Sequence, residues 1–113
     1  MHEVSLMEAT LSLALDHAKA RGAQKIHRLV LQVGERSGIV PEALSFAFDV
    51  VSPGTLAAGA TLQLETVPAL CYCDRCQQTF RPEDWVYACP RCQLLSATVC
   101  QGDSLDLTLL EMS

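Results

Sequence analysis

Four of the six cysteines in this chain of 113 residues form two C-x-x-C pairs. Cys73 and Cys76 make the first pair, Cys89 and Cys92 make the second, and twelve residues lie between the pairs. A spacer of two residues lets a tight turn direct both sulfurs of a pair toward one point, and two such turns supply the four thiolates of a tetrahedral site. The spacing therefore predicts one structural zinc ion held by these cysteines.

A zinc ion with four thiolate ligands keeps no open coordination position, so it does not activate water or a substrate. We expect it to stabilise a segment of about 25 residues, which is too short to bury a sufficient core. The segment has four aromatic side chains: Tyr72, Phe80, Trp85 and Tyr87. Iron is a rival metal, since similar double knuckles hold iron in rubredoxin-like proteins. A redox dithiol is a second rival, but it leaves the other cysteine pair unexplained.

His2 offers a different kind of metal site at the start of the chain. A histidine in second position places the free α-amine of Met1, its own backbone nitrogen and its imidazole in fused chelate rings. The amide nitrogen or the carboxylate of Glu3 is available as a fourth ligand. A planar site dominated by nitrogen suits Ni(II) or Cu(II) better than zinc. The large His2 side chain is expected to disfavour removal of Met1. The alternative is an ordinary solvated terminus.

Other residues that could carry chemistry are given simpler roles. Surface or packing roles are expected for Cys71, Cys100, His17 and His27. Glu35 and Arg36 follow the first expected strand. Two interpretations of these residues remain open: they contact a partner protein, or they lie in a solvated turn.

The first expected element is an amphipathic helix over residues 4–20, where apolar residues recur at helical spacing. Ser5 and Glu8 match the S-x-x-E capping box, and Gly22 marks the end. The helix is therefore expected to start at Ser5, with residues 1–4 as a free lead-in.

Pro41 is well placed to open a second helix, which ends at the breaker sequence 52–54. Alternation of apolar and polar residues predicts strands at 25–33, 61–67 and 104–112. These elements give an α+β fold, in which two helices pack on a small three-stranded sheet and a zinc-ribbon subdomain with four cysteine ligands is inserted before the last strand.

The expected domains are a nickel-binding α/β domain, residues 1–69 with 97–113, and a zinc-binding subdomain, residues 70–96. The net charge of −5, from eight Lys and Arg against thirteen Asp and Glu, argues against a nucleic-acid partner. Apolar stretches are too interrupted for a membrane span, and the start of the chain lacks a signal peptide. We therefore expect a cytoplasmic protein with reduced cysteines.

The order of these motifs resembles the HypA family, with its paralogue HybF, over essentially the whole chain. The resemblance is carried by Met1-His2-Glu3, by V-G-E-R-S-G at 33–38, by P-E-A-L at 41–44, by F-A-F at 46–48 and by the two cysteine pairs. Members of the family are nickel metallochaperones, not enzymes, for NiFe-hydrogenase maturation. They work with the GTPase HypB.

The resemblance implies that this chain carries nickel on the Met1 amine, His2 and Glu3, and zinc on the four cysteines named above. It implies a HypB-type GTPase and the hydrogenase large subunit as partners. Capture and release of Ni(II), with no substrate bond broken, is the implied mechanism. The sequence leaves open whether the chain forms a homodimer.

Two functions of other classes are also considered. One is a zinc-ribbon module that binds nucleic acid or a protein complex, which Arg75, Arg81 and Arg91 favour and the acidic total opposes. The other is a redox or metal-dependent enzyme, which requires an open metal position or a reactive thiol near Cys71 or Cys100.

Overall fold

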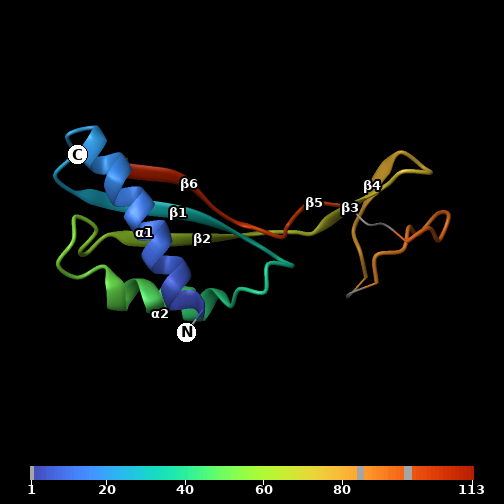
Figure 1. Ribbon diagram of the computed structural model, residues 1–113, viewed down its shortest axis with the longest axis horizontal. Coiled ribbons are helices and arrows are strands. Elements are labelled where there is room, and N and C mark those ends of the chain that lie inside the picture. The colour runs from blue at the N-terminus through green and yellow to red at the C-terminus, as the bar shows by residue number, and fades with distance from the viewer. Residues whose placement is uncertain (1, 84–85, 96–97) are drawn as a thin grey trace. The chain divides into compact units, whose positions relative to one another are not determined.

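The computed structural model describes residues 2–83, 86–95 and 98–113 (Figure 1). Its elements in chain order are α1 (His2–Ala20), β1 (Ile26–Gly34), α2 (Pro41–Val51), β2 (Thr61–Val67), β3 (Leu70–Cys73), β4 (Gln78–Phe80), β5 (Thr98–Gln101) and β6 (Leu105–Met112). They form two sheets, with the strand orders β2-β1-β6 and β4-β3-β5. The predicted α+β class is confirmed. None of the described helices is long and apolar enough to cross a membrane.

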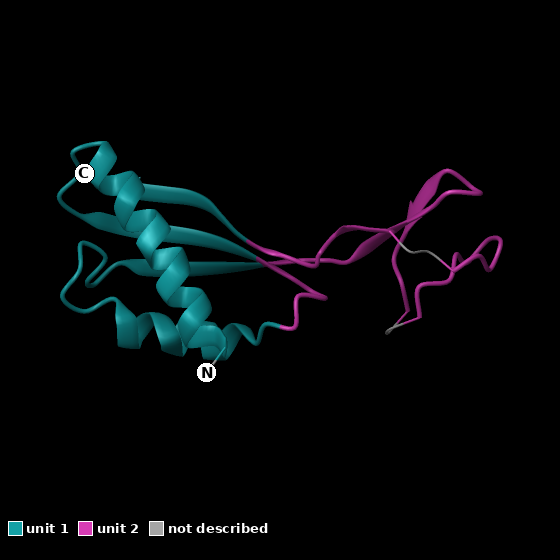
Figure 2. Ribbon diagram, in the orientation of Figure 1, with its two compact units in different colours: residues 1–32, 39–65, 106–113 teal, residues 33–38, 66–105 magenta. Residues whose placement is uncertain are grey.

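The first compact unit comprises residues 1–32, 39–65 and 106–113 (Figure 2). Its central strand is β1, and α1 crosses one face of the sheet and contacts α2 (Figure 1). The buried residues of α1 recur at spacings of four, three and four, as one face of a helix requires. The core contributed by the helices is Met7, Leu11, Ala14, Ala18, Leu44, Ala47 and Phe48, and β1 adds Leu29 and Leu31.

The start of α1 differs from the expectation, because the helix begins at His2 and not at Ser5. The predicted free lead-in is therefore wrong for residues 2–4. Val4 lies three residues before the buried Met7, so a longer helix continues the same buried stripe, and Val4 is half-buried. Glu3 lies in the first turn, where a negative charge complements the positive end of the helix dipole.

The second compact unit comprises residues 33–38 and 66–105, and it is wider than the expected 70–96 (Figure 2). The turn after β1 belongs to it through backbone hydrogen bonds. The N–H of Glu35 donates to the carbonyl of Val67 at 2.8 Å, and that of Arg36 donates to the carbonyl of Gly102 at 2.6 Å. Gly34 permits this approach, since a Cβ there would lie 2.4 Å from the carbonyl carbon of Gly102.

The second sheet was not predicted, because its strands are only three or four residues long and periodicity needs a longer run. β3 pairs antiparallel with β4, placing Cys71 opposite Phe80 and Cys73 opposite Gln78. β3 also pairs antiparallel with β5, and the register shifts beside Cys71. This sheet is the frame on which the first cysteine pair is mounted.

Candidate metal centres

Each C-x-x-C pair lies at the tip of a short antiparallel hairpin in the second unit. The first pair spans the turn between β3 and β4, whose last matched residues are Cys73 and Gln78. The second pair lies between Ala88 and Leu95, which form an antiparallel bridge. A hairpin tip is where a chain reverses within a few residues, so both sulfurs of a pair face the opposite tip.

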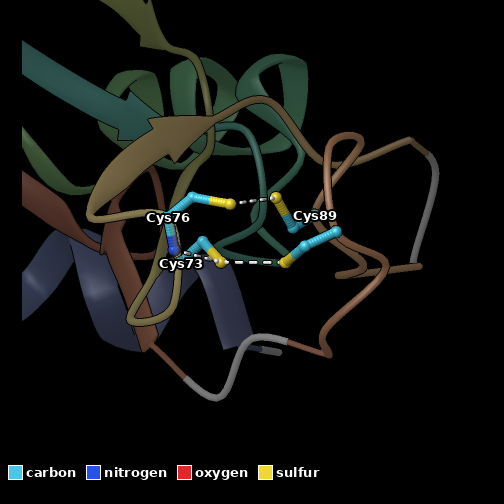
Figure 3. A group of neighbouring side chains, drawn as sticks. Cys73, Cys76 and Cys89 are labelled. Carbon is cyan, nitrogen blue, oxygen red and sulfur yellow. Dashed lines mark hydrogen bonds between the residues drawn. The ribbon is translucent and has the colours of Figure 1, made fainter.

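The structure brings the four predicted sulfurs together. All four lie within 4.8 Å of one another, and among the described residues they form the only such group of His, Cys, Asp or Glu side chains. The sulfurs of Cys73 and Cys92 are 3.5 Å apart, and those of Cys76 and Cys89 are 3.9 Å apart. Figure 3 shows Cys76 directed at Cys89 across the gap.

These separations fit a tetrahedral ion. A metal–sulfur bond of about 2.3 Å gives a tetrahedron with sulfur–sulfur edges of about 3.8 Å. The two separations lie on either side of that value. The thiols are unbridged. The spacing of the four cysteines therefore suits a tetrathiolate metal ion.

The two knuckles have the same backbone conformation. Gln77 follows the first pair and Gln93 follows the second, and both have positive φ, 54° and 67°. The N–H of Gln77 donates to the carbonyl of Cys73 at 2.7 Å, and the N–H of Gln93 donates to that of Cys89 at 2.9 Å. A non-glycine residue rarely adopts this conformation. Sequence reasoning missed both glutamines, although the same residue type after each pair was a visible signal.

Crowding and backbone donors move the acidities of two thiols in opposite directions. The hydrogen bond with Cys92, followed by burial, raises the pKa of Cys76 to about 12. The backbone N–H of Cys92 is the main cause that lowers the pKa of Cys89 to about 6. At neutral pH without metal, Cys76 keeps its proton and Cys89 is largely thiolate. A bound cation favours thiolate at every ligand, so metal binding must displace the Cys76 proton.

The cysteine cluster is packed rather than open to solvent. Cys71, Phe80 and Cys73 are buried in one small apolar cluster with Cys89, and Tyr87 packs against it. Trp85, expected among these aromatics, lies outside the described residues. Burial raises the pKa of the Cys71 thiol, which is opposite to the shift that a reactive thiol needs.

The predicted nickel ligands lie at the start of α1, in the first unit. His2 is exposed and Glu3 is half-buried, while Met1 lies outside the described residues. The first four N–H groups of a helix have no acceptor within it. The backbone nitrogens of His2 and Glu3 are therefore not used by the helical ladder. At a helical ψ of about −42°, successive nitrogens also lie on one side of the chain, as fused chelate rings require.

The other histidines and the two charged residues after β1 are not near either predicted metal site in sequence. His27 is hydrogen-bonded through Nε2 to the Ser113 hydroxyl at 2.6 Å, and His17 is exposed on α1. Glu35 accepts a hydrogen bond from Arg81 at 3.0 Å, and the side chain of Arg36 is only 12% exposed. The solvated-turn alternative therefore fits Glu35, which is exposed, and does not fit the largely covered side chain of Arg36.

Comparison with known proteins gives a consistent result. The family model HypA, described as hydrogenase/urease nickel incorporation, metallochaperone, matches residues 1–112. The hydrogenase maturation factor HypA of Picosynechococcus sp. is 46% identical over 112 residues, which cover 99% of both chains. That of Acidithiobacillus ferrooxidans is 38% identical over 112 residues, also 99% of both chains.

Two solved structures have the same fold along their length. The Ni metallochaperone HypA from Helicobacter pylori superposes with a TM-score of 0.73 at 28% identity, covering 97% of this chain and 96% of that one. A second solution structure, of a HypA protein, gives a TM-score of 0.72 at 30% identity, covering 100% of this chain and 97% of that one.

Proposed function

The chain belongs to the HypA family of nickel metallochaperones, and we propose that it carries Ni(II) on its N-terminus to the large subunit of a NiFe-hydrogenase. Family membership makes it a nickel-incorporation factor and not an enzyme. The observation that supports the proposed site is the position of His2 and Glu3 in the first turn of α1, with backbone nitrogens outside the helical ladder.

In the proposed complex, nickel binds the Met1 amine, the imidazole and backbone nitrogen of His2, and a ligand from Glu3. The ion must displace one proton from the amine and one from the backbone nitrogen of His2, so binding weakens as pH falls. The positive end of the α1 dipole opposes a cation by roughly 0.3–1 kcal/mol. That opposition lowers the affinity, which suits an ion that has to be released to a partner.

We propose zinc as the resident metal of Cys73, Cys76, Cys89 and Cys92. The sulfur separations near 3.8 Å support it, as does the position of the four cysteines, of which two are buried and two are half-buried. When bound, the ion holds the two hairpin tips together, and the chemistry it supplies is structural. The two metals would lie on different units, so loading one site does not use the ligands of the other.

The proposed partners are a HypB-type GTPase and the hydrogenase large subunit, and the proposed location is the cytoplasm. Two of the arginines that favoured nucleic-acid binding have partners within the protein. Arg81 is paired with Glu35 at 3.0 Å, and Arg91 donates to the side chain of Gln78 at 2.8 Å. No observation favours a second function.

The test compares the protein with its authentic terminus and a version that carries two extra residues before Met1. Equilibrium dialysis followed by metal analysis gives the nickel and zinc bound to each. We expect zinc at one ion per chain in both versions and loss of nickel in the extended one. His2→Ala should lose nickel too, whereas His17→Ala, an exposed histidine of the same helix, should not. Unchanged nickel affinity in the extended version or in His2→Ala contradicts the proposal.

A further inference from the structure

The outer edge of β6 is a binding feature that metal carriage does not use. β6 is the last strand in the order β2-β1-β6, and within the described residues no strand pairs with its other side. Both the N–H and the C=O of Ser113 bond to Lys25 of the chain preceding β1. Successive residues of a strand direct these groups to alternate sides, so those of Met112 point to the outer edge. Such an edge is a template for an added strand.

A groove runs beside this edge. It has a volume of about 260 Å³ and is lined by five residues of β6 between Leu107 and Met112, by His17 of α1 and by Arg21, the residue that follows α1. Leu109 is 41% exposed there, although alternation predicts that it faces the core. A groove between an edge strand and a helix is the geometry in which extended peptides add to a sheet.

The charge of the groove is opposite to that of the surrounding unit. The first unit carries four Lys or Arg against eight Asp or Glu. The described lining of the groove nevertheless contains no acid, and its ionisable side chains, His17 and Arg21, are both basic. An occupant with acidic side chains on the helix-facing side complements this lining.

We propose that the β6 edge binds an extended, acidic segment of a partner protein as an added strand. Backbone hydrogen bonds to the outer edge supply sequence-independent affinity. Every second side chain of the segment faces α1, and an acidic residue there meets His17 or Arg21. The inference does not depend on where nickel binds.

The experiment uses the full, metal-loaded protein and a capped six-residue peptide of alternating glutamate and valine as the probe. Amide NMR spectra and hydrogen exchange are recorded as the peptide is added. We expect the largest shifts along β6 and at Arg21, and slower exchange of the Met112 amide. The same peptide with lysine in place of glutamate should bind at least about tenfold more weakly.

Two variants separate the groove from general charge effects. Arg21→Glu should weaken the glutamate peptide by about tenfold. Lys19→Glu makes the same charge change two residues earlier in the chain, but Lys19 lines a different pocket beside Gly54 and Leu56, so binding should be unchanged. No binding at millimolar peptide, shifts away from β6, or equal losses in both variants would overturn the proposal. Light scattering that shows a dimer with a protected Met112 amide would also overturn it, in favour of a second copy.

Discussion

Gly34→Ala is expected to loosen the turn that belongs to the second unit. The added Cβ would lie 2.4 Å from both the carbonyl carbon and the oxygen of Gly102, whereas ordinary contact begins near 3.4 Å. The backbone at Gly102 must therefore move by about 1 Å. The same carbonyl accepts the N–H of Arg36 at 2.6 Å, so relief of the clash weakens that bond.

The cost follows from these two effects. Overpacking costs about 1–3 kcal/mol and loss of the hydrogen bond about 0.5–1.5 kcal/mol, so we expect about 2–4 kcal/mol in total. Native-state hydrogen exchange at the Arg36 amide measures it, because each 1.4 kcal/mol is about a tenfold change in the opening equilibrium. Protection should fall by about thirtyfold to several hundredfold.

Gly38→Ala is the matched control in the same turn. Gly38 has a φ of +77°, and no atom lies within 4 Å of the position that a Cβ would take, so its substitution tests backbone conformation without a clash. Its cost should be about 1 kcal/mol. Equal protection of the Arg36 amide in the two variants would refute the argument that the close approach of the Gly102 backbone requires glycine at position 34.

Three further outcomes follow from the packing and the cysteine site. Leu31 is fully buried, so Leu31→Ala should lower the free energy of unfolding in urea titrations by about 2–5 kcal/mol. Leu13 is 51% exposed, so Leu13→Ala should change it little. Similar losses in the two variants would count against the described core. Chelation of the cysteine-bound metal should abolish exchange protection in β3 and β4 and spare α1, and a uniform loss would argue against two separable units. Because the pKa of Cys76 is raised to about 12 and that of Cys89 is lowered to about 6, zinc uptake at pH 8 should release a proton from Cys76 and almost none from Cys89. Zinc affinity should therefore fall as pH is lowered, more steeply below pH 6, and calorimetry in two buffers of different ionisation enthalpy that detects no proton release would contradict this.

Sequence patterns predicted the elements whose signal repeats along many residues. The buried stripe of α1 recurs from Met7 to Ala18, and Pro41 gives α2 a sharp start. The cysteine spacing predicted which sulfurs would meet, because two-residue spacers have few geometries. Sequence did not reveal the start of α1, because Ser5 and Glu8 imitate a helix cap inside the first turns.

Other features depend on contacts that side-chain patterns do not encode. The turn at Gly34 joins the second unit through backbone hydrogen bonds and through the space that a missing Cβ leaves beside Gly102. The strands of the second sheet are too short for a period to be detected. The exposure of Leu109 follows from the edge position of β6, and strand order is a tertiary property.

Nickel transfer to a metal-free hydrogenase large subunit tests the central claim most directly. The protein is loaded with radioactive nickel, mixed with the large subunit and the HypB-type GTPase, and the label in the isolated large subunit is counted. We predict transfer from the authentic protein, and none above the level of a chaperone-free control from His2→Ala loaded with the same total nickel. Equal transfer from the authentic protein and from His2→Ala would contradict delivery from the N-terminus.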